Sequence, residues 1–144
     1  MKILIINGPN INMLGVREKD IYGDQTYSQL LAQINKWSTD YGVEIKHVQS
    51  NHEGVLIDEI QAAYGQFDAI IINPAAYTHT SIAILDALKA VNLPSVEVHI
   101  SNICERESFR QVSYAGMACE KTVKGLGLEG YRKAILYLKE KYSN

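Results

Sequence analysis

Arg17 and Tyr22 stand five positions apart in a long polar stretch that follows an aliphatic run at the start of the chain. A phenol with an ordinary pKa of about 10 is a poor base at neutral pH, because little of it is ionised. A guanidinium within a few Å favours the phenolate. The pair therefore predicts a general base, Tyr22, activated by Arg17. The alternative is a solvated loop whose tyrosine only packs.

His99 follows Glu97 by two positions in the apolar run 95–100. Residues i and i+2 share one face of a strand, so this carboxylate and this imidazole are placed to hydrogen-bond or to act on the same ligand. The carboxylate would hold the ring in one tautomer and favour its protonated form, as a general acid requires. Glu97 and His99 are therefore candidates for an acid pair, with a structural histidine as the alternative.

Arg106 and Arg110 are spaced for one helical turn after the same run. They would add positive charge at the site or bind a substrate carboxylate in a forked arrangement. Surface ion pairs with Glu105 and Glu107 are the alternative. His79 carries a stronger structural interpretation, as a cap or packing residue.

Hydrophobic patterning indicates the elements that position these residues. The runs 3–6 and 69–72 are unbroken and aliphatic, which is typical of strands buried on both faces of a parallel sheet. Further strands are expected at 43–49, 95–100 and 121–124, and helices at about 26–41, 55–64, 82–91 and 131–142. This alternation implies right-handed crossovers. We predict an α/β fold, a flavodoxin-like three-layer sandwich with a five-stranded parallel sheet and helices on both faces.

Such sheets bind ligands at the carboxyl ends of their strands. In this chain that edge would gather Asn10 after the first strand, Asn73 after the third, and Glu97, His99 and Ser101 at the end of the fourth. Most of the chemically interesting residues are thus expected on one rim.

Composition narrows the classes of function. The 144 residues are expected to form one domain, 1–144, and the 47% hydrophobic and 21% charged fractions are typical of a soluble globular protein. A net charge of -2 offers no basic field for nucleic acid. No apolar run approaches the ~20 residues of a membrane span and no signal peptide is evident, which indicates the cytoplasm. Cys104 and Cys119 lack metal-ligand spacing and are expected to be reduced thiols.

Several familiar cofactor and phosphorylation sites are not supported. Residues 125–130 fit G-x-G-x-x-G, but the chain ends inside the next helix, so no following strand can supply the acidic residue of a dinucleotide site. A flexible strand-to-helix turn is the better interpretation. A flavin loop would need hydroxyl-rich residues after the first strand, and a receiver domain would need an aspartate where Asn73 stands. No cofactor and no metal are therefore predicted.

Over essentially its whole length the chain resembles the type II 3-dehydroquinate dehydratases. The segments that carry the resemblance are INGPNINMLG at 6–15, RE at 17–18 with YG at 22–23, NPAAYTHTS at 73–81, EVHISN at 97–102 and the arginine segment 106–114. Lys19 departs from the family, which usually has proline there, and Ser108 stands at a commonly acidic position. In the family, the segment that corresponds to 17–23 is the lid of the site, and Lys19 would loosen it without removing a reacting group.

The resemblance implies anti dehydration of 3-dehydroquinate to 3-dehydroshikimate through an enolate, in aromatic biosynthesis or quinate breakdown. By position, Tyr22 is the base at C2, Arg17 stabilises its phenolate, Asn10 supports the enolate oxygen, and His99, oriented by Glu97, protonates the departing C1 hydroxyl. The implied substrate-binding residues are Asn73, His79, Ile100, Ser101 and Arg110. The family is typically a dodecamer of trimers, in which Asp86 reaches a neighbour's site.

The residues independently suit this chemistry. Elimination beside a ketone needs a base, an acid and oxyanion support. No lysine ends the first four strands, which argues against an imine mechanism. The rival hypotheses are a serine hydrolase built on Ser101 and His99, which lacks a G-x-S-x-G elbow, and a non-catalytic flavodoxin-like binding module.

Overall fold

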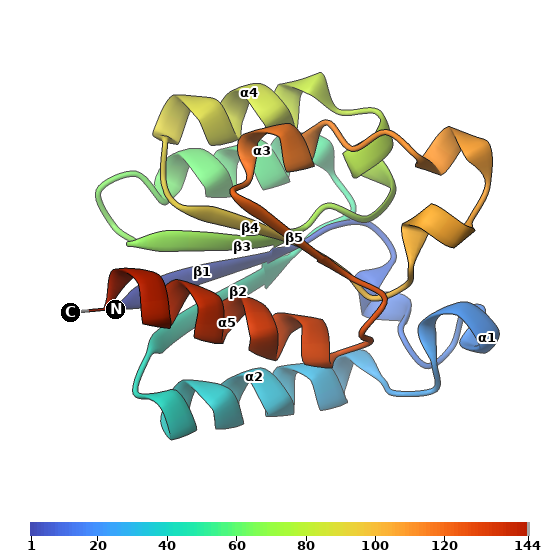
Figure 1. Ribbon diagram of the computed structural model, residues 1–144, viewed down its shortest axis with the longest axis horizontal. Helices are drawn as coiled ribbons and strands as arrows, with labels where there is room; N and C mark the ends of the chain where they lie inside the picture. The colour runs from blue at the N-terminus through green and yellow to red at the C-terminus, as the bar shows by residue number, and fades with distance from the viewer. Residues whose placement is uncertain (144) are drawn as a thin grey trace.

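The computed structural model describes residues 1–143, and its centre is a parallel sheet with the strand order β2-β1-β3-β4-β5 (Figure 1). The strands are β1 Lys2–Asn7, β2 Glu44–Gln49, β3 Ala69–Asn73, β4 Ser95–His99 and β5 Lys121–Lys124. The longer helices are α2 Tyr27–Tyr41, α3 Glu53–Ala62, α4 Ile82–Val91 and α5 Glu129–Tyr142. The α/β prediction and its flavodoxin-like strand order are confirmed.

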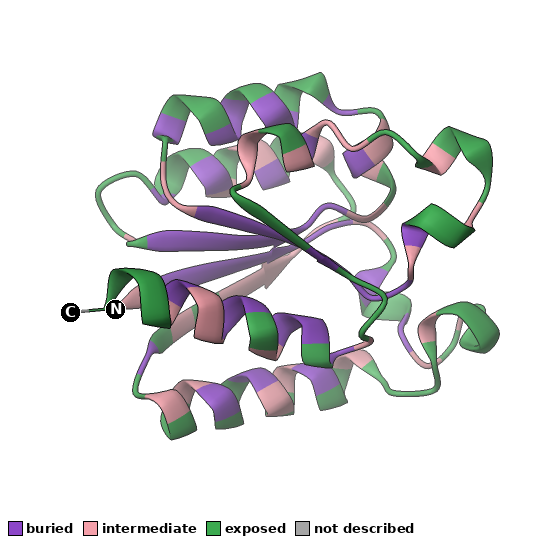
Figure 2. Ribbon diagram, viewed as in Figure 1, coloured by how far each residue is buried: buried purple, intermediate pink, exposed green. Residues whose placement is uncertain are grey.

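Helices α2 and α5 cover one face of the sheet, and α3 and α4 cover the other (Figure 1). The side chains of β1 alternate between the two cores: Ile3 and Ile5 pack toward α2 and α5, while Leu4 and Ile6 pack toward α3 and α4. Figure 2 shows β3 and β4 buried throughout and β1 buried except at its first residue, Lys2. Burial on both faces explains why β1 is aliphatic at each of its positions 3–6 rather than at every second one.

Element ends mostly follow local signals. Helix α2 is capped at its N-terminus by a capping box between Thr26 and Gln29, and it is capped at its C-terminus by Gly42, which has the left-handed conformation. Helices α3 and α5 both begin two residues earlier than predicted, at Glu53 and Glu129. In both helices the added turn starts with an acidic side chain, which the positive end of the helix dipole favours.

The glycine motif at 125–130 forms the turn from β5 into α5, as the sequence predicted. Gly125 and Gly127 have φ of +76° and +57°, a region that L side chains rarely adopt. Gly130 lies against the sheet, where an added Cβ would be 3.3 Å from Val98 Cγ1. The glycines therefore serve backbone geometry and close packing.

The connections between the strands contain several short helices, of which the sequence indicated only helical turns around 108–113, where η4 lies. The short helices are η1 Ile11–Met13, α1 Lys19–Tyr22, η2 Ala75–His79, η3 Ile103–Glu105, η4 Ser108–Arg110 and η5 Ala115–Ala118. Gly8 joins two of these loops, because its N–H donates to the Asn73 carbonyl at 2.7 Å and an added Cβ would lie 2.4 Å from the Pro74 oxygen. The loops after β1 and β3 are thus held together by backbone contact.

Within residues 1–143, no helix has both the length and the apolar character that crossing a membrane requires.

Candidate active site

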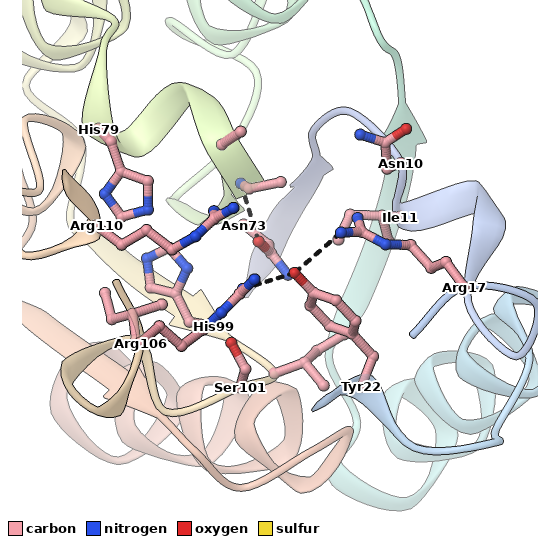
Figure 3. A pocket seen from close by; sticks show the side chains of 14 residues that line it. Asn10, Ile11, Arg17, Tyr22, Asn73, His79, His99, Ser101, Arg106 and Arg110 are labelled. Atoms are coloured by element: carbon pink, nitrogen blue, oxygen red, sulfur yellow. Dashed lines mark hydrogen bonds between the residues drawn. The ribbon is translucent and has the colours of Figure 1, made fainter. Parts of the chain in front are cut away.

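A cavity of about 140 Å³ lies at the carboxyl ends of β1, β3 and β4 (Figure 3). Its wall includes all but two of the site residues predicted from the sequence. The lining residues are Asn10, Ile11, Arg17, Tyr22, Asn73, Ala75, Ala76, His79, His99, Ile100, Ser101, Ile103, Arg106 and Arg110. The sheet has its topological switch point here, because the chain leaves β1 and β3 toward opposite faces. The fold therefore brings these side chains together at the carboxyl edge of the sheet, as the sequence predicted.

Two guanidinium groups converge on the phenol oxygen of Tyr22 (Figure 3). Arg17 Nη2 donates to it at 3.1 Å and Arg106 Nη1 at 2.7 Å. Arg17 comes from the same loop as Tyr22, whereas Arg106 directly follows η3, beyond β4. Charge-assisted donors of this kind stabilise a negative charge on the oxygen.

The sequence did not predict a contact between Arg106 and Tyr22. It indicated only that Arg106 and Arg110 could add positive charge at the carboxyl edge of the sheet or bind a substrate carboxylate. The four-residue spacing of these arginines was the only signal, and it does not separate their roles. In the structure Arg110 donates to Glu107 at 2.8 Å and also lines the cavity. The two interpretations of Arg110, as a surface ion pair and as a site residue, are therefore compatible.

Glu97 lies behind His99, outside the cavity wall, and is fully buried. His99 Nε2 is 2.7 Å from Glu97 Oε1, so the strand spacing produces the predicted pair. Burial alone would raise the pKa of Glu97. Hydrogen bonds from His99, Ser113 and Thr78, with the charge of His99, outweigh it and lower the pKa to about 2. Glu97 is therefore a carboxylate at neutral pH.

His79 contributes a defined nitrogen to the cavity. Its Nδ1 is 2.7 Å from the carbonyl oxygen of Val112. Because a carbonyl only accepts, Nδ1 carries the hydrogen, and Nε2 of the neutral ring is an acceptor. Burial lowers the pKa of His79, and the neighbouring His99 and Arg110 act in the same direction, which keeps the ring neutral at neutral pH.

Asn73 is held by a buried tyrosine that the sequence analysis did not identify. Asn73 Nδ2 donates to Tyr131 Oη at 2.9 Å, and Tyr131 donates to Asn7 Oδ1 at 2.7 Å. The other end of the amide, Asn73 Oδ1, accepts from the Ala75 N–H at 3.1 Å. Tyr131 and Asn7 are completely buried. The orientation of the Asn73 amide in the cavity floor is thus fixed from below by α5.

We expect Tyr131→Phe to lower the free energy of unfolding by about 1–3 kcal/mol, because it leaves the Asn7 oxygen and an Asn73 N–H without their partner in the core. Urea unfolding at one protein concentration measures this. Tyr137→Phe is the matched control on the same helix; its hydroxyl meets the exposed Lys141, so we expect a change within about 0.5 kcal/mol. Equal effects of the two substitutions would contradict the expectation.

The remaining predicted residues lie as follows. Asn10 has a left-handed backbone (φ 67°), and its N–H donates to Asn51 Oδ1 at 3.0 Å, which ties its loop to the end of β2. Ile100 and Ser101 follow β4 directly and are buried in the wall. Asp86 is exposed on α4 and does not line the cavity of its own chain.

Two features bear on the rival hypotheses. Among the hydrogen bonds of the described residues, none joins the Ser101 hydroxyl to His99, whose Nε2 is already engaged with Glu97, so nothing here favours a serine hydrolase. In the same part of the chain, no group of three or more His, Cys, Asp or Glu side chains is placed to hold a metal ion.

The sequence matches the family model described as dehydroquinase class II over residues 1–139. The chain belongs to the class II dehydroquinase family. It is 53% identical over 140 residues to a 3-dehydroquinate dehydratase of Caldicellulosiruptor bescii, covering 96% of this chain and 97% of the relative. It is 52% identical over 143 residues to one of Clostridium acetobutylicum, covering 99% of each. The crystal structure of type II dehydroquinase from Butyrivibrio crossotus has a TM-score of 0.95 at 51% identity and covers 96% and 97% of the two chains. The predicted family, and with it the prediction of a lyase, is confirmed.

Proposed function

We propose that this member of the class II dehydroquinase family dehydrates 3-dehydroquinate to 3-dehydroshikimate, with residues 1–144 acting as one catalytic domain. The reaction is an anti elimination through an enolate, with Tyr22 as base and His99 as acid. The observation that carries the proposal is that one cavity contains both a phenol oxygen held by two guanidinium groups and an imidazole held by a buried carboxylate.

On the base side, the Tyr22 phenolate removes a proton from C2 of the substrate. Arg17 and Arg106 hydrogen-bond to the oxygen of Tyr22, both as the phenolate before the proton transfer and as the neutral phenol after it. The electron pair of the broken C–H bond moves into the ketone, and the resulting enolate oxygen needs a donor. Asn10, at the mouth of the cavity, would hold that donor or the water that serves as one.

On the acid side, protonated His99 gives its proton to the C1 hydroxyl, which leaves as water while the enolate collapses to the enone.

The substrate is held by groups of matching polarity. His79 Nε2 accepts from a hydroxyl and Arg110 donates to one, while the Ile100 and Ser101 segment, with the Ser101 hydroxyl, binds the carboxylate. Asn73 donates its second amide hydrogen into the cavity.

The direct test is an ultraviolet assay of the purified protein with 3-dehydroquinate, without added metal or coenzyme. We expect an absorbing enone product with normal saturation kinetics, and failure to form it would reject the proposal. Among the described residues of the cavity wall there is no lysine, so borohydride added with substrate is expected to leave activity intact. Irreversible inactivation under those conditions would indicate an imine mechanism instead.

We expect Arg106→Met to lower kcat about 30-fold with KM nearly unchanged, because a hydrogen bond to a charged group is lost at the base and not at the substrate. Steady-state kinetics measure the two constants separately. Arg132→Met is the control, since Arg132 lies on α5 and pairs with Glu129 at 2.6 Å, away from the cavity. A raised KM with unchanged kcat would instead place Arg106 on the substrate.

We also propose a homo-oligomer, a dodecamer of trimers, in which Asp86 contributes to a neighbour's site. Asp86 supports this because it is exposed and cannot serve its own cavity. Helix α4 packs beside η5, and these two elements expose the apolar side chains of Ile82 and Met117, which suits a subunit interface. The cytoplasmic location, the absence of a nucleic-acid partner and the absence of a cofactor stay predictions.

A further inference from the structure

The Glu97 carboxylate accepts hydrogen bonds from three hydroxyl groups in addition to His99. Thr78 Oγ1 and Ser113 Oγ each lie 2.5 Å from Oε1, and Thr122 Oγ1 lies 2.9 Å from Oε2. The three hydroxyls come from separate segments, namely η2, the connection between η4 and η5, and the edge strand β5. A carboxylate buried this completely is costly unless its lone pairs are satisfied, and these donors satisfy both oxygens.

In each of these hydrogen bonds the hydroxyl donates and the Glu97 carboxylate accepts. Thr78 Oγ1 and Ser113 Oγ also lie 3.1 Å from each other, but each is only 2.5 Å from the charged Oε1, which is the stronger acceptor, so we assign both protons to Glu97. Ser113 Oγ in turn accepts from the Gly116 N–H at 3.0 Å. Gly116 closes the arrangement, because an added Cβ there would lie 2.5 Å from Glu97 Oε2 and 2.9 Å from Ser113 Oγ. Both carboxylate oxygens are therefore fixed in place by close contacts.

Other charged or titratable groups near Glu97 do not replace these donors. His79 and Cys119 act on it only through space. Arg110 and Lys124 line a second cavity that Glu97 also touches, and in the described part of the chain neither hydrogen-bonds to the carboxylate. The hydroxyls and His99 are its direct partners.

The orientation of the imidazole follows from this arrangement. An ionised carboxylate cannot donate, so the His99 Nε2 that faces it must carry a hydrogen. Nδ1 is then the nitrogen that gains and loses the second proton, and it is the ring nitrogen not occupied by Glu97. His99 itself lines the cavity. A ring of the other tautomer would place a lone pair against the carboxylate.

We propose that Thr78, Ser113 and Thr122 are positioning residues for the acid step: their hydroxyls fix the Glu97 carboxylate so that His99 keeps its hydrogen on Nε2 and delivers the reacting proton from Nδ1. The inference rests on the proposed function for its kinetic consequence. Its structural consequence, the tautomer of His99, is independent of any substrate.

The test removes the donors from each carboxylate oxygen in turn. Thr122→Val removes the hydroxyl donor to Oε2, and the double variant Thr78→Val/Ser113→Ala removes both hydroxyl donors to Oε1, which then keeps only His99 Nε2. We expect kcat to fall about tenfold in Thr122→Val and further in the double variant, with KM within about twofold of wild type. Nitrogen-15 NMR of labelled histidine is expected to show His99 as the Nε2–H tautomer in the wild type and as a mixture of tautomers in the variants.

Thr122→Ser and Thr78→Ser keep the hydroxyls and are expected to retain wild-type kcat and tautomer. Thermal melting separates folding from positioning, and Thr122, on an exposed edge strand, tolerates valine well. Unchanged kcat with an unchanged tautomer, or equal losses in the serine and valine variants, would overturn the inference. If the wild type does not dehydrate 3-dehydroquinate but the tautomer shifts as expected, the proposed function fails and the positioning role stands.

Discussion

Tyr22→Phe is expected to lower kcat on 3-dehydroquinate roughly 10³-fold, the scale at which a positioned proton-transfer group contributes. The substitution removes only the oxygen that Arg17 and Arg106 hold, while the ring still fills its half-buried place. KM should therefore change little, and the loss should appear in kcat. Steady-state ultraviolet kinetics at saturating substrate measure it.

Tyr64→Phe is the matched control, because Tyr64 is 71% exposed and lies outside the cavity wall. Its kcat should stay within twofold of wild type. A Tyr22→Phe enzyme with a tenth or more of wild-type kcat would show that another group removes the proton.

His99→Ala is expected to lower elimination by a similar factor while leaving the first half of the reaction intact. Tyr22 and its arginines are untouched by this change, so the enolate still forms and returns. In deuterated water the recovered substrate should therefore exchange its C2 hydrogen, although little enone appears. Proton NMR of the substrate measures the exchange and the ultraviolet assay measures elimination.

The comparison with Tyr22→Phe makes this division sharp, because that variant should lose exchange and elimination together. His52→Ala is the control: His52 is exposed and makes no side-chain cap to α3. Loss of exchange in His99→Ala, or normal elimination by it, would contradict the assignment of His99 as the acid.

The parts of this architecture that the sequence predicted depend on strong local constraints. Residues 3–6 and 69–72 are aliphatic at every position because both faces of β1 and β3 are covered. Once the parallel sheet is inferred, the residues at the carboxyl ends of its strands or just beyond them, such as Asn73 and Ser101, must meet at one edge. The pair of Glu97 and His99 followed from strand geometry alone.

The parts that it did not predict depend on contacts between distant segments. Arg106 meets Tyr22 across 84 positions, and short helices in the intervening loops set the approach. In the sequence Tyr131 fits the pattern of apolar residues on the inner face of α5. Nothing local indicates that its hydroxyl accepts a hydrogen bond from Asn73. Thr122 likewise looks like an ordinary strand residue until the burial of Glu97 is known.

The two arginines that hydrogen-bond to Tyr22 come from different segments of the chain. Arg17 shares a segment with the phenol, bounded by Gly15 and Gly23, both with positive φ, whereas Arg106 is anchored in the wall beyond β4. Any outward swing of that segment takes Arg17 along and leaves Arg106 behind. Both guanidinium groups would thus reach the phenol oxygen only when this segment lies against the wall beyond β4, so the completed pair of donors would itself depend on the segment being closed.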